Sequence, residues 1–224
     1  MNEVMEQIGP YIREAMQDEK NQKREQFRRL NRFVREGQIL FAGSSLMEQF
    51  PINELVQDYG LKEIIYNRGI GGFVLDEFEE ALQECVFDLK PAKIFLNIGT
   101  NDLNDARLDL NRFVEKYEKV LNKITDKLPD TKIYLMAYYP VNPTDVQMPH
   151  MAEMLKVRTN ERIDSANKKI REMAEKKGYC FINVNQPLKD ENGCLREEFS
   201  KDGMHFYADG YEAIYHELVS FITE

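Results

Sequence analysis

Five short apolar runs recur along the chain, and their composition predicts strands that are buried on both faces. Between and after these runs, apolar residues recur at spacings of three and four, which predicts amphipathic helices. Strands that alternate with helices favour a parallel sheet covered on both faces. The predicted strands are residues 38–43, 63–67, 92–99, 132–139 and 179–184. The predicted helices are marked by Leu75, Phe78 and Leu82; by Leu110, Phe113, Val114, Tyr117, Leu121 and Ile124; by Ile163, Ala166, Ile170 and Met173; and by Tyr211, Ile214, Tyr215, Leu218 and Ile222.

The chain begins with a densely charged segment that does not share this alternation. Within residues 11–36, Phe27, Leu30 and Val34 recur at helical spacing among Arg and Glu, which predicts an amphipathic helix with a narrow apolar stripe. We therefore expect residues 1–36 to form an N-terminal helical extension and residues 37–224 to form one domain. The stripe can pack on this domain or pair with a second copy, so a homodimer is possible.

Composition excludes several classes of protein. Thirty basic and 39 acidic residues give a net charge of −9, which argues against a nucleic-acid surface and against docking on anionic lipid. No apolar run approaches the ~18 residues of a membrane span, and the first residues lack the apolar core of a secretory signal. The three cysteines, Cys85, Cys180 and Cys194, are distant and odd in number, which disfavours a disulfide framework or a zinc ribbon. We expect a cytoplasmic globular protein.

The segments that follow the strands carry the candidate chemistry, because ligands of open parallel sheets bind beyond the carboxyl ends of the strands. The first predicted strand ends in Gly43-Ser44-Ser45, the second in residues 67–72 (NRGIGG), and the third in Gly99-Thr100-Asn101-Asp102. Asp202 and His205 precede the last helix. A hydroxyl, glycine turns, a carboxamide, a histidine and a carboxylate are the parts that acyl transfer needs.

Each piece also has an ordinary structural interpretation. A Gly-Ser-Ser turn commonly caps a helix, Asn101 and Asp202 can serve turns and caps, and His205 can be a packed side chain. NRGIGG does not continue as a dinucleotide or Walker motif, since Val74 stands at the third glycine position. Asp102, Asp105 and Asp109 suggest a metal phosphoesterase, but with a single histidine nearby a solvated helix start is the better interpretation. Only the conjunction of the pieces, in this order, favours acyl transfer.

The conjunction also resembles a known family. GSSLMEQFP, NRGIGG, IGTND and DGMHF are similar to the sequence blocks of the SGNH (GDSL-type) hydrolases, and most similar to those of the platelet-activating-factor acetylhydrolase-like esterases and lipases. The resemblance runs from about Gln38 to the C terminus. It implies a flavodoxin-like three-layer α/β/α sandwich with a five-stranded parallel sheet, and a serine hydrolase that needs no metal and no cofactor.

Carried over residue by residue, the resemblance implies that Ser45 is the nucleophile, His205 its base and Asp202 the partner of the base. The backbone N–H groups of Ser45 and Gly72 and the Asn101 side chain would form the oxyanion hole. Two positions depart from the family pattern, because Ser44 and Phe73 stand where the family commonly has Asp. We expect Phe73 at the pocket mouth, and Tyr138 and Tyr139 as a pocket wall that binds substrate.

The predicted function is a carboxylic ester hydrolase that acts on short, acetyl-like esters of small molecules through an acyl-enzyme. A carbohydrate O-acetylesterase is the alternative, and a catalytically weak binding or scaffold protein is a third hypothesis. Since every candidate catalytic residue lies C-terminal to residue 36, we expect the N-terminal helix to be dispensable for the chemical step.

Overall fold

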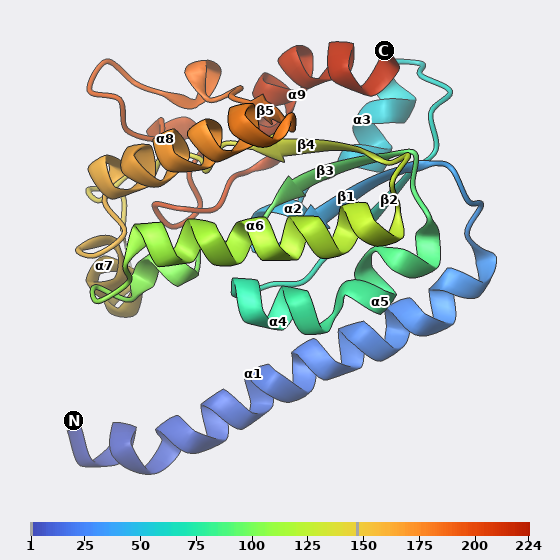
Figure 1. Cartoon of the computed structure of the whole chain (residues 1–224). Helices are drawn as coiled ribbons and strands as arrows, with labels where there is room; N and C mark the ends of the chain where they lie inside the picture. The colour runs from blue at the N-terminus through green and yellow to red at the C-terminus, as the bar shows by residue number, and fades with distance from the viewer. Residues whose placement is uncertain (1, 147) are drawn as a thin grey trace.

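The sheet has five strands, all parallel, in the order β2-β1-β3-β4-β5 (Figure 1). The computed structural model describes residues 2–146 and 148–224. The strands are β1 (Ile39–Gly43), β2 (Ile65–Gly69), β3 (Lys93–Asn97), β4 (Lys132–Met136) and β5 (Cys180–Ile182). This confirms the predicted sheet and its parallel direction.

The helices lie in the connections between strands and at the two ends of the chain. Their bounds are α1 (Asn2–Leu30), α2 (Ser45–Glu48), α3 (Ile52–Asp58), α4 (Leu75–Glu80), α5 (Leu82–Cys85), α6 (Leu110–Lys127), α7 (Pro149–Leu155), α8 (Asn160–Lys177) and α9 (Ala208–Thr223). The four predicted helical segments correspond to α4 with α5, α6, α8 and α9. Among the described helices, none combines the length and the apolar character that a bilayer crossing needs.

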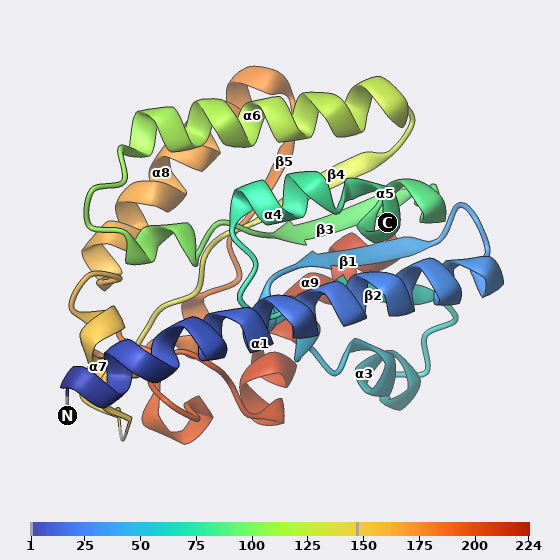
Figure 2. The same cartoon turned by 90° about the horizontal axis from the view of Figure 1, so that it is seen from below.

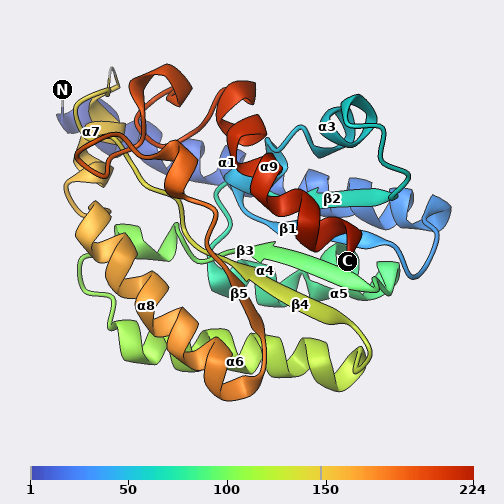
Figure 3. The same ribbon diagram turned by 90° about the horizontal axis from the view of Figure 1, so that it is seen from above.

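Two apolar cores, one on each face of the sheet, hold the three layers together. Alternate residues of β1 divide between them, with Leu40 and Ala42 in the first core and Ile39 and Phe41 in the second. Helices α4, α5, α6 and α8 close the first core, and α2, α3 and α9 close the second. Figures 2 and 3 show these two faces from below and from above. The molecule is therefore the three-layer α/β/α sandwich that the resemblance implies, and the sheet is covered on both faces as the alternating pattern predicts.

Helix α1 lies outside these layers, beside α4 and α5, with its N-terminal end standing off the body (Figure 1). Phe27 packs against the first core, and the Arg68 guanidinium of β2 lies over its ring at 4.8 Å. Arg24 and Arg28 form ion pairs with Glu84, whose carboxylate is almost fully buried. Part of the predicted apolar stripe thus packs on the chain's own domain. A homodimer formed through this stripe stays a prediction.

The strand register brings the candidate segments to one edge of the sheet. Gly43 at the end of β1 pairs with Gly69 of β2 and with Asn97 of β3. A Cβ on Gly43 would lie 1.9 Å from the Asn97 carbonyl oxygen, so only glycine fits where the chain turns into α2. The segments after β1, β2 and β3 therefore leave the sheet side by side.

Candidate active site

Ser45 is the first residue of α2 and lies half-buried at the carboxyl edge of the sheet. The preceding Ser44 is buried, and its backbone N–H donates to the Asn97 carbonyl at 3.2 Å. These surroundings separate the two hydroxyl side chains, because Ser45 borders the large cavity described below and Ser44 does not.

A hydrogen-bonded chain links Ser45 to the loop before α9. The Ser45 hydroxyl lies 2.9 Å from His205 Nε2, and His205 Nδ1 lies 2.7 Å from Asp202 Oδ2. The other carboxylate oxygen, Asp202 Oδ1, accepts the backbone N–H groups of Met204 and His205. The loop therefore holds the carboxylate, and the carboxylate holds the imidazole. Because an ionised carboxylate can only accept, Nδ1 carries the proton and Nε2 is left to accept from the serine.

Neighbouring hydrogen-bond donors keep the Asp202 carboxyl group ionised. Partial burial acts to raise the pKa of the Asp202 carboxyl, but the hydrogen bonds donated by the His205 ring and by the backbone outweigh it. The pKa of Asp202 therefore lies below its ordinary value of 3.8. The carboxylate stays ionised at neutral pH, so it can orient the imidazole and stabilise its protonated form.

The loop after β2 brings Gly72 to the cavity that Ser45 borders. Gly72 has a φ of +73°, a conformation that favours glycine, and it borders the same cavity. Its N–H, like that of Ser45, has no acceptor among the residues that the structure describes. The backbone groups on either side of this N–H are hydrogen-bonded. The Gly71 N–H donates to Glu48 at 2.7 Å, and the Gly72 carbonyl accepts from Lys20 of α1 at 3.1 Å.

Asn101 follows β3 and also borders the cavity. Its Nδ2 donates to the Phe73 carbonyl at 3.0 Å, and its Oδ1 accepts from the buried Arg158 at 2.8 Å. One of the two Nδ2 hydrogens therefore has no acceptor in the described part of the chain. This hydrogen and the N–H groups of Ser45 and Gly72 belong to residues that border one cavity, and free donors of this kind are what an oxyanion needs.

The cavity above these groups has a volume of about 750 Å³. Four methionines lie in its wall: Met16, Met151, Met154 and Met204. Helix α1 contributes Glu19, Lys20 and Lys23 beside Met16. Helix α1 thus forms part of the cavity wall, which bears on the expectation that it is dispensable for the chemical step. Neither Arg158 nor Lys20 had a sequence signal, since the residues whose oxygen atoms they bind lie more than 50 residues away.

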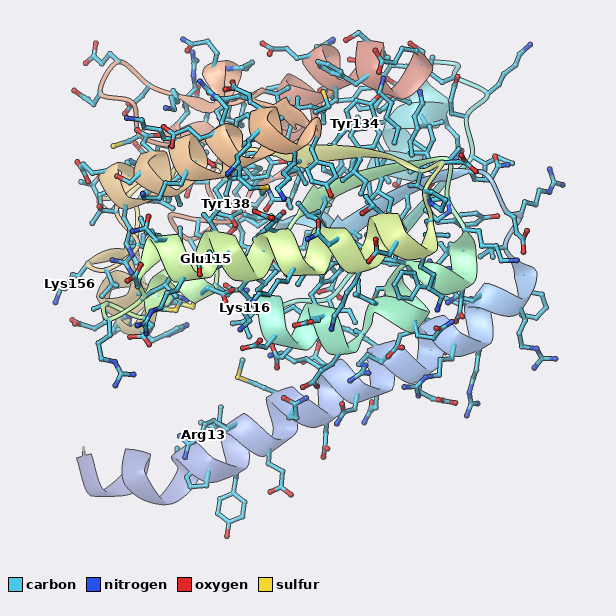
Figure 4. All side chains as sticks on the ribbon, viewed as in Figure 1. Arg13, Glu115, Lys116, Tyr134, Tyr138 and Lys156 are labelled. Atoms are coloured by element: carbon cyan, nitrogen blue, oxygen red, sulfur yellow. The ribbon has the colours of Figure 1, made fainter. Side chains whose placement is uncertain are left out.

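Three predicted substrate-binding residues lie elsewhere. Phe73, Tyr138 and Tyr139 are at most 2% exposed and border no part of the cavity. Tyr138 lies inside the layer between the sheet and helices α6 and α8, with its hydroxyl on the Ile98 carbonyl (Figure 4). This corrects the expectation of an aromatic wall. An aromatic side chain after a strand can turn into the core as readily as into a cleft, and here burial decides.

The three carboxylates that suggested a metal site do not converge. Asp102 accepts the Leu75 backbone N–H at the start of α4, Asp105 binds Arg107, and Asp109 caps α6. Within the described ranges, no group of three or more His, Cys, Asp or Glu side chains is arranged to hold a metal.

Comparisons with known proteins bear on the family and the fold. The model of the GDSL-like lipase/acylhydrolase family matches residues 49–213, which include Asn101, Asp202 and His205 and begin just after Ser45. A solved Streptococcus pneumoniae structure, described provisionally as a platelet activating factor, has a TM-score of 0.85 at 29% identity, covering 96% of this chain and 98% of that one. A GDSL-like lipase from Bacteroides thetaiotaomicron has a TM-score of 0.72 at 21% identity, covering 89% and 97%.

One curated relative is longer than this chain. The N-acylneuraminate cytidylyltransferase of Escherichia coli is 25% identical over 194 residues, which are 86% of this chain and 42% of that protein. The chain thus spans less than half the length of the curated relative that it matches.

Proposed function

Because the chain belongs to the GDSL-like lipase/acylhydrolase family, we propose that it hydrolyses short-chain carboxylic esters through an acyl-enzyme formed on Ser45. The hydrogen-bonded chain from Ser45 through His205 to Asp202, at the edge of a large cavity, is the observation that carries this proposal. A serine hydroxyl is a poor nucleophile at neutral pH, and a neutral imidazole at 2.9 Å is positioned to take its proton.

The proposed reaction has two halves. Ser45 Oγ forms a bond to the ester carbonyl carbon while its proton moves to His205 Nε2, and the carbonyl oxygen gains the negative charge. That oxygen accepts hydrogen bonds from the Ser45 and Gly72 backbone N–H groups and from Asn101 Nδ2. The tetrahedral intermediate collapses, and the leaving alcohol takes the proton from His205. Water then attacks the acyl-enzyme with His205 again as base, which releases the acid and restores the serine.

A panel of p-nitrophenyl esters from acetate to palmitate tests this function. We expect hydrolysis with the highest kcat/KM for the shortest acyl chains, and no change of rate in EDTA. Failure of every ester in the panel would refute the proposal. Loss of activity in EDTA that a divalent ion restores would return attention to metal chemistry.

A carbohydrate O-acetylesterase is the second candidate, and it differs only in the alcohol half of the ester. The name of the Escherichia coli relative refers to an N-acylated sugar acid, which favours an acylated sugar as substrate. Acetylated sugars added to the same panel separate the two candidates. A kcat/KM for an acetylated sugar well above that for p-nitrophenyl acetate would assign the alcohol half to a carbohydrate.

A scaffold protein without turnover is the third hypothesis. Ser44 and Phe73, in place of the family's usual carboxylates, are the features that favour it. The hydrogen-bonded Ser45, His205 and Asp202 favour catalysis instead. Covalent labelling of Ser45 by a fluorophosphonate separates the two, since only an activated serine reacts at an appreciable rate.

A further inference from the structure

Arg158 lies in the turn between α7 and α8 and is only 1% exposed. Its Nε donates to Asn104 Oδ1 at 3.0 Å, its Nη2 donates to Asn101 Oδ1 at 2.8 Å, and its Nη1 faces the Met204 sulfur. Within the residues described, none of these hydrogen bonds goes to a carboxylate. A buried cation without a paired anion lowers the stability of the fold, so its position beside the site indicates a functional role.

The guanidinium remains charged at neutral pH. Burial lowers the pKa of Arg158 to about 10, and the nearest acids, Asp102 and Asp202, act in the opposite direction. The positive charge is therefore present when the enzyme works, one hydrogen bond behind the Asn101 amide and out of contact with water.

Two neighbours determine which way the Asn101 amide points. A guanidinium can only donate, so Arg158 requires the amide oxygen on its side, and the Phe73 carbonyl can only accept, so it requires the amide nitrogen. Both contacts select the same orientation. Turned by 180°, the amide would present its oxygen where the proposed oxyanion forms, and would repel it.

We propose that Arg158 is a positioning residue that orients the Asn101 amide and strengthens its free N–H as a donor to the oxyanion. This inference rests on the proposed ester hydrolysis. A cation hydrogen-bonded to an amide oxygen draws electron density from the amide nitrogen, so the Nδ2–H becomes a stronger donor in a site of low polarity. The benefit grows as negative charge develops, so it acts on the transition state more than on the bound substrate.

The experiment is a double-mutant cycle with p-nitrophenyl acetate. Arg158→Met keeps the length of the side chain and removes its charge and donors. We expect it to lower kcat about tenfold or more with KM within about twofold, and Asn101→Ala to lower kcat roughly a hundredfold. In the Asn101→Ala background, Arg158→Met should change kcat less than about twofold, because its route to the oxyanion is gone.

Arg162→Met is the matched control. Arg162 lies four residues further on, in the first turn of α8, and donates to the Asp105 backbone carbonyl at 2.7 Å, in the same loop as Asn101 but without contact to its side chain. Its removal should leave kcat unchanged. Arg158→Lys, which keeps the charge but offers a single donor head, should recover part of the lost rate. Circular dichroism and thermal unfolding verify that each variant is folded.

A measurement on the unmutated chain keeps the inference testable if the Arg158 variants do not fold. Phosphonylation of Ser45 puts an oxygen where the oxyanion forms. We then expect the Arg158 Nε–H resonance of ¹⁵N-arginine-labelled protein to shift, and that of Arg162 to stay.

The failures are distinguishable. Wild type that hydrolyses no ester refutes the proposed function itself. If wild type hydrolyses esters, four outcomes refute only the role of Arg158. They are kcat losses that multiply in the double variant, an Arg158→Met effect confined to KM, an Arg158→Met kcat equal to that of wild type, and an Arg158 resonance that does not shift.

Discussion

At the scale of single residues, Ser44 and Ser45 are chemically identical neighbours that the fold treats differently. Ser44 is buried against the end of β3, whereas Ser45 faces the cavity with its hydroxyl on His205. We expect Ser45→Ala to abolish turnover and Ser44→Ala to lower kcat about tenfold, since a buried hydroxyl beside the proposed nucleophile supports the turn without reacting. Fluorophosphonate labelling followed by peptide mass mapping identifies the reactive serine. Label on Ser44 would contradict this assignment.

Asp102 gives the protein a pH dependence of stability that is separate from the reaction. Burial raises the pKa of Asp102 to about 6 from 3.8, although the Leu75 N–H and Lys116 act to lower it. The native state therefore binds this proton more tightly than the unfolded chain does. Its contribution to stability is present below about pH 4 and is lost as the pH rises through 6. Relative to Asp102→Asn, wild type should lose about 2–3 kcal/mol of unfolding free energy over this window, measured by urea denaturation.

Asp105→Asn is the control for this prediction. Asp105 lies in the same loop but is exposed, and the hydrogen bond from the Arg107 side chain lowers the pKa of its carboxyl. Its contribution therefore has the opposite sign and is lost as the pH falls. If the unfolding free energy of Asp102→Asn falls with rising pH as much as that of wild type and of Asp105→Asn, the effect does not come from Asp102.

The candidate residues differ in how well the sequence predicts their positions. Ser45, Asp202 and His205 follow directly after a strand or share one loop, so local patterns suffice to bring them near the same edge. The contact of Arg158 with Asn101 spans 57 positions and depends on how α8 packs, which no local pattern contains. The prediction that Phe73 lies at the pocket mouth was wrong for a similar reason, because the direction of its ring depends on how the whole core packs.

At the scale of elements, the sequence predicted helices correctly where the segment with a helical apolar pattern is long. Helices α6 and α8 each span 18 residues, enough turns to reveal an apolar stripe. Helices α3 and α7 have seven residues each and were not predicted, because two turns do not distinguish a helix from a loop. The missed α7 carries two of the four cavity methionines, so the substrate side of the site was the part least visible from the sequence.

Helix α1 holds the loop that carries Gly72. Lys20 donates to the Gly72 carbonyl and is also paired with Glu77, with both side chains largely buried. Without it, the Gly72–Phe73 peptide keeps only the hydrogen bond from the Phe73 N–H to the Ile70 carbonyl at 3.3 Å, so the Gly72 N–H is held less firmly at the cavity. We expect Lys20→Met to lower kcat about threefold to tenfold, since small displacements of catalytic donors are costly. Steady-state kinetics on p-nitrophenyl acetate give the result.

Gln22→Met is the control on the exposed side of the same helix. It makes the same kind of change without touching the loop, so kcat should stay as in wild type. Equal losses in the two variants would assign the effect to the helix surface in general and would leave Lys20 without a specific role.

At the scale of the whole molecule, the site depends on segments that are far apart in the chain. The site takes residues from four connections: Ser45, Gly72, Asn101 and His205. Because the strands are parallel, their carboxyl ends lie at one edge of the sheet, and these connections meet there. The sequence predicts this gathering because parallel strands point the same way. It does not predict the closing of the cavity by α1, since a charged amphipathic helix gives no indication of which surface it will cover.

Deletion of residues 1–36 tests whether residues 37–224 form an independent domain. Glu84 is 2% exposed, and Arg24 and Arg28 of α1 pair with its carboxylate. The truncation breaks these ion pairs and removes the contacts of Phe27 with the first core, which together cost about 3–5 kcal/mol. For a chain of this size we expect Tm to fall by about 10 °C, measured by differential scanning calorimetry. Activity should fall as well, because Lys20 is lost with the helix.

Two further variants identify the cause. Glu84→Gln in the full chain breaks the ion pairs but keeps α1, so it should reproduce part of the loss of Tm and leave the activity, which depends on Lys20, unchanged. Deletion of residues 1–15 alone removes the exposed Ile8, Tyr11 and Ile12 and keeps every contact of Lys20, Arg24 and Arg28. This shorter truncation should keep both Tm and kcat. If it loses as much stability as the full deletion, the N-terminal half of α1 has a partner that matters more to folding than Glu84 does.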